Sequence, residues 1–310
     1  MYTRMLGIPV QSGDFVQTVR DIFRVNLVAA AGTTWLAYDI VTTIHLERAL
    51  VWRSKQSLPT ILYYLVRYFT MFSLIFNLAV ETNSRVSTTF CEFWNWYRPF
   101  TGPEFSMALG EALFLMRICA LYPQNWKVFA LITLLYFSQI TSATILIVLE
   151  VRSIQPIPIS LYFPIPGCTT TSQRYVREGY TSWAIALLTS FVYFGLTMYK
   201  SIRSFHCLRR QSLWSTILEM RHLAPMYYIF ARDGVLYFFV IAISNSLNML
   251  FTVAYTDRAV EQVGIAGLMA AYGVMSSRLF LNLRYTALGT EELDHNEDEE
   301  ISFTPHNHSR

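Results

Sequence analysis

Apolar stretches of about twenty residues recur along this chain, and they constrain its fold more than any other feature. A helix needs about twenty apolar residues to cross a hydrocarbon core about 30 Å thick. These stretches lack the polar stripe that a core helix of a water-soluble protein carries once per turn. With 53% hydrophobic and 15% charged residues among 310, the chain has more apolar side chain than a soluble domain of this length buries. The sequence predicts an all-α polytopic membrane bundle.

Seven stretches are long enough to span a membrane, and the predicted helices cover residues 26–46, 60–80, 105–122, 128–149, 180–199, 234–255 and 263–283. The chain then divides into an N-terminal segment (1–25), a seven-helix transmembrane domain (26–285) and an acidic tail (286–310). The tail is rich in Asp and Glu and poor in apolar residues, so burial cannot offset the entropy of ordering it. We expect the tail to be disordered.

Lysine and arginine predict the orientation, because they stay preferentially in short cytoplasmic loops. All three lysines, Lys55, Lys127 and Lys200, fall in the odd-numbered loops. The fifth loop, 200–232, is the most basic. We therefore expect the N-terminus outside and the C-terminus in the cytoplasm. The first span serves as the targeting signal in this interpretation, and both the plasma membrane and an internal membrane fit it.

Several stretches resemble a known family. They are YDIVTTIHLERALVWRSKQSLPTILYYLVRY from Tyr38 to Tyr68, the LMRICALY run ending at Tyr122, the Gly167-Cys168 pair, ARDGVLYFFVI (231–241) and SRLFLNLR (277–284). Together they are similar to a large family of multi-helix membrane proteins from basidiomycete fungi, whose N-terminal part is a domain of unknown function. The resemblance implies a fungal seven-helix membrane protein, supports the fold, and brings no catalytic residues with it.

Charged side chains inside the predicted spans are the first candidates for function, because each costs about 2.5–3.5 kcal/mol in hydrocarbon unless it is paired or hydrated. At 1.5 Å per residue, Asp39, Arg67 and Arg278 each lie about 10 Å from the cytoplasmic end of their spans. One carboxylate and two guanidiniums thus share a level, and we expect them to form a charge cluster. Expected hydrogen-bonding neighbours are Tyr38, Ser276 and Asn282.

This cluster has two interpretations, a static tie between helices or a switch whose pairing changes between two states. If Asp39 and Arg67 pair, exchanging their charges should restore the expression that either single variant loses.

Glu111 lies near the middle of the third predicted span and is the best single candidate for a ligand or proton site. Asn77, Asn245 and Asn248 could reach a common interior with it. Asparagine in a transmembrane helix also serves simply to hold helices together.

Cys91 and Cys168 fall in the second and fourth loops, both predicted to lie outside, where an oxidising compartment permits a disulfide. Cys119 and Cys207 face the reducing side. The Pro-rich segment 155–177 cannot form a helix and is predicted to lie as a lid across the bundle mouth. Residues Trp94, Trp96 and Tyr97 are interpreted as interfacial anchors.

Membrane lipids are the expected partners, because loop 200–232 can form an amphipathic helix at the inner leaflet. A docking surface for a cytoplasmic partner is the alternative for the same loop. A nucleic-acid partner is not expected, since the net charge is only +3 and the basic residues are scattered.

Known catalytic and cofactor patterns are missing from the sequence. The seventh span has no lysine for a retinal Schiff base, and His45 is the one histidine in or near a span, too few for an intramembrane zinc site. GxSxG, HExxH and phosphate-binding glycine loops are absent. We therefore expect no enzyme activity, cofactor or metal. A receptor-like sensor is the favoured function, with a small-solute transporter or channel, or a membrane scaffold, as alternatives.

Overall fold

The structure is a computed structural model that describes residues 12–153, 155–156, 166–168, 170–171, 176–210, 217–255 and 258–302. The α-helices are α1 (Ser12–Leu50), α2 (Leu58–Tyr64), α3 (Thr70–Thr82), α4 (Thr88–Pro99), α5 (Phe105–Leu121), α6 (Trp126–Ser153), α7 (Val176–Arg210), α8 (Ile217–Ala254) and α9 (Val263–Ser302). Two π-helical turns, η1 (Leu65–Phe69) and η2 (Phe100–Glu104), and one 3₁₀ turn, η3 (Ala259–Gln262), continue neighbouring helices. Two short strands, β1 (Gln155–Pro156) and β2 (Thr170–Thr171), pair antiparallel.

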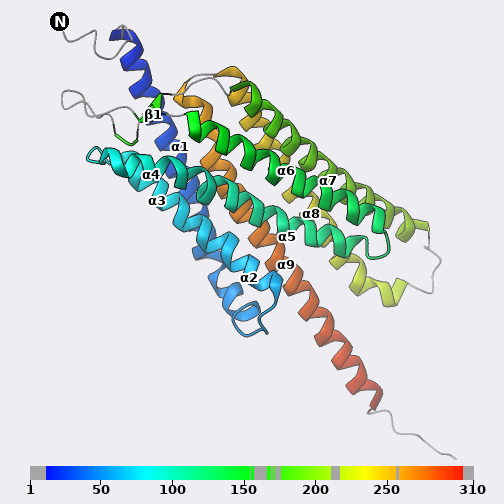
Figure 1. Cartoon of the computed structure of the whole chain (residues 1–310). Helices are drawn as coiled ribbons and strands as arrows, with labels where there is room; N and C mark the ends of the chain where they lie inside the picture. Colours follow the sequence, from blue (N-terminus) through cyan, green and yellow to red (C-terminus); the bar gives the residue numbers. More distant parts are fainter. Residues whose placement is uncertain are drawn as a thin grey trace, which may run out of the picture.

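The helices pack side by side as an elongated bundle (Figure 1). Within the described residues, six helical segments are long and apolar enough to cross a membrane: Val16–Leu50, Leu58–Thr82, Trp126–Leu149, Thr181–Lys200, Val235–Ala254 and Ala259–Tyr285. Large apolar side chains such as Leu134 and Phe137 on α6 point outward, 68% and 60% exposed. Such a surface suits lipid as solvent. The predicted all-α polytopic membrane bundle is confirmed.

Contacts between loops show which helix ends meet. A disulfide joins Cys91 in α4 to Cys168 in the segment between α6 and α7. Beside it, the backbone N–H of Gly167 donates to the carbonyl oxygen of Asn83, which directly follows α3 (3.0 Å). The C-terminal ends of α3 and α6 therefore lie together, and we call this the disulfide end of the bundle.

The beginning of α1 and the connection from α8 to α9 lie at the disulfide end as well. The Asn26 side chain on α1 donates to the carbonyl oxygen of Glu81 in α3 (3.3 Å). The Arg258 guanidinium, directly before η3, binds the Asp21 carboxylate of α1 with its shortest contact at 2.8 Å. We call the opposite end the basic end, defined by Arg48, Arg53, Lys55, Lys127 and Lys200.

Helix α5 is the seventh segment to run between the two ends, although it has only 17 residues. Because α6 ends at the disulfide end, it begins at the basic end. Since α3 also ends at the disulfide end, α4, η2 and α5 must return the chain to the basic end. A 17-residue helix covers about 26 Å, and η2 extends it. Figure 1 shows α5 lying between α3 and α6. Seven passes leave the beginning of α1 and the spanning part of α9 running out at opposite ends of the bundle.

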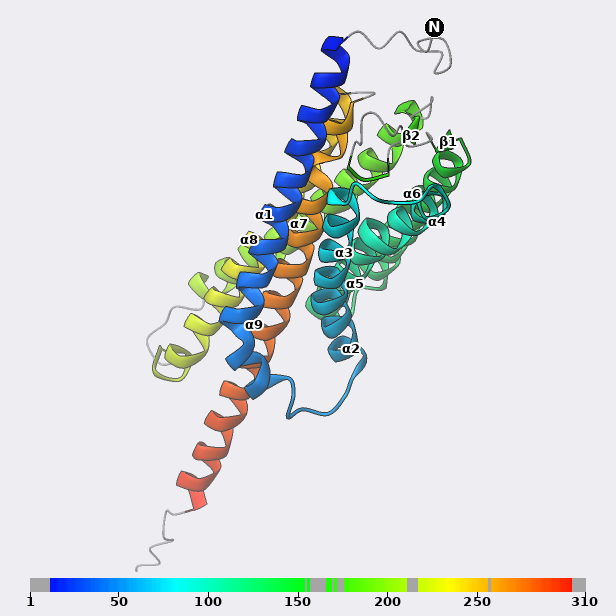
Figure 2. The ribbon, with the colours of Figure 1, turned by 90° about the vertical axis from the view of Figure 1, so that its left-hand side faces the viewer.

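Helix α9 is the central element, because 72% of the residues in its most apolar stretch are buried. Figures 1 and 2 both show it alongside α1. Two glycines permit close packing: a Cβ on Gly32 of α1 would lie 3.1 Å from the Ala266 carbonyl oxygen, and one on Gly110 of α5 would lie 2.7 Å from a ring carbon of Tyr272. Phe114, Phe238 and Leu268 belong to the apolar core around α9.

Several expected boundaries differ from those in the structure. Helix α1 begins at Ser12, so it takes in much of segment 1–25. Helix α9 continues to Ser302, whereas the composition of 286–310 predicts disorder; Glu-rich sequence has good intrinsic helix propensity, and a helix already formed in α9 needs no new nucleus. Residues 303–310, most of the predicted lid 155–177, and residues 211–216 of the basic loop lie outside the described residues.

Candidate functional site

The predicted charge cluster forms where α1, η1 and α9 meet. The Arg67 Nη1 lies 3.3 Å from Asp39 Oδ2, and the Arg278 Nε lies 2.5 Å from Asp39 Oδ1. The Arg67 Nε also lies 3.2 Å from an oxygen of Glu47. Side chains of Asp39, Glu47 and Arg67 are at most 1% exposed, while Arg278 is 45% exposed. Two carboxylates and two guanidiniums therefore balance one another.

Neutral donors and a π-helical turn complete this charge cluster. Arg67 Nη2 donates to the Thr43 hydroxyl (2.5 Å), and the Tyr68 hydroxyl donates to Glu47 (2.8 Å). Both Arg67 and Tyr68 lie in η1, whose wider turn changes the direction of the residues around it. Consecutive side chains thereby reach the same carboxylate on α1. The Tyr63 ring lies 5.7 Å from the Arg67 guanidinium carbon. The cluster ties three helical segments together without leaving net charge.

A second polar group, the Glu111 network, joins five helices near the middle of the bundle. Glu111 Oε1 on α5 accepts hydrogen bonds from Gln139 Nε2 on α6 (2.7 Å) and from the Tyr272 hydroxyl on α9 (2.6 Å). The Asn245 amide on α8 donates to that hydroxyl (3.3 Å) and to the Ser190 hydroxyl on α7 (2.9 Å). The carboxylate contacts α6 and α9 directly, and Tyr272 and Asn245 extend the network to α8 and α7.

Two acceptors in the Glu111 network are buried without a hydrogen-bond partner among the described residues, Glu111 Oε2 and Gln139 Oε1. Glu111 itself is 2% exposed. A buried acceptor without a donor costs about 1–3 kcal/mol. Such a cost is typical of sites that take up a proton, a water molecule or a ligand atom in another state.

Other residues that the sequence predicts for these sites lie elsewhere. Asn248 donates to the carbonyl oxygens of Ser244 and Gly264, so it joins α8 to the start of α9 (2.9 and 3.2 Å). Asn282 donates to the Tyr237 hydroxyl (2.8 Å). Two further predicted neighbours make other contacts: Asn77 donates to the Ser73 carbonyl oxygen and Ser276 to the Tyr272 carbonyl oxygen. The third, Tyr38, is 65% exposed.

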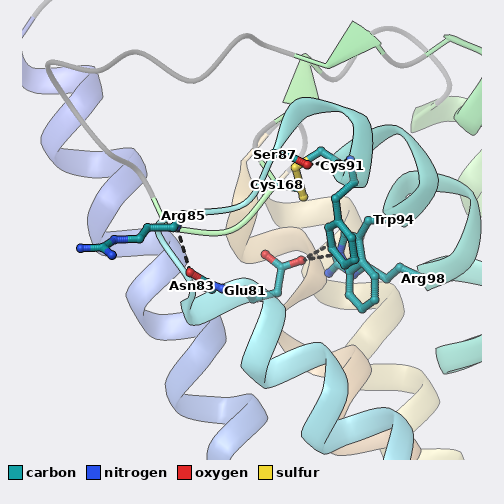
Figure 3. Close-up of a disulfide and its surroundings, with 9 residues drawn as sticks. Glu81, Asn83, Arg85, Ser87, Cys91, Trp94, Arg98 and Cys168 are labelled. Carbon is teal, nitrogen blue, oxygen red and sulfur yellow. Dashed lines mark hydrogen bonds and ion pairs between the residues drawn. A yellow bond between two sulfur atoms is a disulfide. The ribbon is translucent and has the colours of Figure 1, made fainter.

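At the disulfide end, several side chains gather around Glu81, and we call this group the Glu81 cluster (Figure 3). The Glu81 carboxylate pairs with Arg98 (3.2 Å) and accepts a hydrogen bond from the Trp94 indole (3.2 Å). Gly167 has φ +83°, and a Cβ there would lie 2.6 Å from Glu81 Oε2, so the position requires glycine. Trp94 is 1% exposed, so the anchor interpretation is wrong for this residue, whereas Trp96 is 45% exposed.

Sequence reasoning misses Glu47, Gln139 and Tyr272. Glu47 has a signal that could find it: Asp39, Thr43 and Glu47 are spaced by four and therefore share one face of α1. Gln139 and Tyr272 are neutral and carry no comparable signal. No cluster of three or more His, Cys, Asp or Glu side chains arranged for metal binding occurs in the part of the chain that the structure describes.

The N-terminal part of the chain is similar to a known protein family. Residues 27–72 match a family of unknown function, DUF6533. The matched segment contains Asp39, Thr43, Glu47 and Arg67, so it includes all of the charge cluster except Arg278. No curated protein matches the chain. The chain is an integral membrane protein with an N-terminal domain of unknown function.

Proposed function

We propose that this protein is a receptor-like membrane sensor without catalytic activity, and that the Glu111 network is its switching element. The observation that carries the proposal is one hydrogen-bond network that links five helices and contains a buried carboxylate with an oxygen unpaired among the described residues. A ligand or proton that changes the hydrogen bonds of Glu111 acts on all five helices at once. A switch needs such an element, with two discrete arrangements of similar free energy.

Orientation supports a sensor with its disulfide end outside. Cys91 and Cys168 require an oxidising compartment, and the opposite end carries the lysines that favour the cytoplasm. Two independent arguments therefore agree on the N-terminus outside and the C-terminus inside. The Glu81 cluster and the disulfide hold the outer segments on the bundle. The inner ends of the helices are therefore the part that moves.

The lengths of α7 and α8 support an output at the basic end. Helix α7 continues past position 199, the end of the span that the sequence predicts, to Arg210, about 17 Å further. Helix α8 begins at Ile217, about 26 Å before position 234, where the span that the sequence predicts begins. Both extensions belong to the basic stretch 200–232, for which a cytoplasmic partner and anionic lipid are the proposed contacts.

A distance measurement tests the switch. Spin labels on cysteines at Lys55 and Arg203, both exposed at the basic end, report the position of α7 in a chain whose Cys119 and Cys207 are serine. We expect Glu111→Gln, measured by double electron–electron resonance in lipid nanodiscs, to redistribute the population between two distances.

A matched control for this measurement is Glu92→Gln, which alters an exposed carboxylate on α4 and should leave the distances unchanged. One narrow distribution, identical in the parent chain and in Glu111→Gln, would contradict the proposed switch.

A small-solute transporter is the second candidate, and the unpaired acceptors Glu111 Oε2 and Gln139 Oε1 favour it because they lie midway through the bundle. Flux assays in proteoliposomes distinguish the two functions. A transporter would show solute- or proton-dependent flux that Glu111→Gln abolishes, whereas a sensor would show none. Purification from native membranes that recovers a signalling protein with the chain would favour the sensor.

The sequence similarity is also proposed to be wider than the matched segment 27–72. We infer that the whole helical region is similar to a family of membrane proteins from basidiomycete fungi. A scaffold role is the remaining alternative, and it predicts that the Glu111→Gln variant retains every property of the parent chain.

A further inference from the structure

Arg278 is the exposed member of an otherwise buried cluster. Its side chain is 45% exposed, although it lies on α9, the most buried spanning helix, and its neighbours Ser277 and Leu279 are 0% and 3% exposed. Only its Nε has a hydrogen-bond partner among the described residues, the Asp39 carboxylate. The two terminal amino groups of the guanidinium therefore remain as donors on the outside of the bundle.

The depth of Arg278 brings these donors close to a lipid headgroup. The residue precedes position 283, the end of the span that the sequence predicts, by about 8 Å along the helix. Because Asp39 holds the Nε, the two terminal amino groups are the part of the side chain that reaches toward the interface, as the charged groups of arginines near span ends do. Asn282 and Tyr285 follow at spacings of four and seven, so they share the face of α9 that leads from Arg278 to the basic end. Tyr285 is 67% exposed.

Charge also favours an anionic headgroup over a zwitterionic one. Arg48, Arg53 and Lys55 are exposed at the same end of the bundle, and juxtamembrane basic residues attract anionic lipid. Guanidinium binds phosphate with two parallel hydrogen bonds, which the two free amino groups of Arg278 can supply.

We propose that Arg278 binds the phosphate of an anionic phospholipid in the leaflet at the basic end, with Tyr285 beside the headgroup. Asp39 holds the Nε of the guanidinium, so the two terminal amino groups are the donors that remain for the phosphate. The lipid then contacts a residue of the charge cluster directly, which links lipid composition to the packing of α1 against α9. This site is separate from the Glu111 network and does not depend on it.

Native mass spectrometry of the full chain in detergent, titrated with phosphatidylserine or phosphatidylcholine, tests the proposal. We expect tighter binding of phosphatidylserine, and about fivefold weaker binding of it in Arg278→Gln, the change that one basic residue near an anionic surface produces. Arg278→Lys should keep the preference for phosphatidylserine. The matched control is Arg85→Gln, an exposed arginine at the disulfide end, which should bind like the parent chain.

Asp39→Asn separates lipid binding from folding, because it frees the guanidinium while weakening the bundle. We expect phosphatidylserine to bind this variant at least as tightly as the parent chain. Inorganic phosphate at millimolar concentration should not displace the lipid. Equal affinity for the two lipids, unchanged affinity in Arg278→Gln, or displacement by inorganic phosphate would overturn the proposal.

Discussion

Replacing Asp39 with asparagine removes one of the two carboxylates that balance Arg67 and Arg278. Asp39 is buried and contacts both guanidiniums, at 3.3 and 2.5 Å. Its loss leaves Glu47 as the one carboxylate that faces two positive charges. Removing one partner of a buried ion pair costs about 3–5 kcal/mol, most of it from the charge left behind. We expect a loss of unfolding free energy in this range.

Restoring charge balance should recover part of the lost unfolding free energy. In the double variant Asp39→Asn with Arg278→Gln, the remaining groups are Arg67 and Glu47, which already lie 3.2 Å apart. We expect the double variant to be about 1–3 kcal/mol more stable than additive costs predict, the coupling typical of contacting charges. Unfolding in mixed detergent micelles with increasing dodecyl sulfate, followed by tryptophan fluorescence, measures all three variants.

The structure also changes the expectation for exchanging the charges of Asp39 and Arg67. Because Asp39 contacts Arg278 and Arg67 contacts Glu47, the exchange would place an arginine beside Arg278 and an aspartate beside Glu47. We now expect no rescue of either single variant. Rescue by the exchange, or a cost below about 1 kcal/mol for Asp39→Asn with additive behaviour in the double variant, would refute the four-charge cluster.

Two further predictions concern the packing of the bundle. Cys91→Ala removes the disulfide to Cys168, which closes a loop of 77 residues, so it should lower the unfolding free energy by about 4 kcal/mol. Dithiothreitol should lower the unfolding free energy of the parent chain by the same amount. Unchanged stability in both experiments would contradict the disulfide. Gly110→Ala forces a methyl group against Tyr272 and should cost about 1–3 kcal/mol. Gly195→Ala, with open space around it, should be neutral or stabilising in the same dodecyl sulfate unfolding assay. Equal effects of both substitutions would show that Gly110 is not tightly packed.

Much of the fold follows from the sequence because lipid imposes simple rules on it. Runs of about twenty apolar residues predict spanning helices directly. Asp39, Arg67 and Arg278 come together as their depths indicate, because a rise of 1.5 Å per residue relates sequence position to depth. The precise ends of helices do not follow in this way: nothing in the composition of segment 1–25 indicates that α1 begins at Ser12.

The partners within each site are harder to predict than its charged members. Depth places Glu111 near the middle of a helix, but which neutral side chain reaches it depends on the rotation and crossing of five helices. Asn245 and Asn248 are one turn apart on α8, yet only Asn245 joins Tyr272 in the network. The wider turn η1 is also invisible in the sequence, and it brings both Arg67 and Tyr68 to Glu47.

The sidedness of the two chain ends distinguishes a bundle of seven passes from one of six. Seven passes place them on opposite faces of the membrane, whereas six passes, with α5 lying outside the hydrocarbon core, place them on the same face. Epitope tags at Met1 and Arg310, probed with antibody before and after selective permeabilisation of intact cells, distinguish these arrangements. We predict that the N-terminal tag is accessible from outside and the C-terminal tag only from the cytoplasm. Accessibility of both tags from one face would contradict the seven-pass bundle and the proposed orientation.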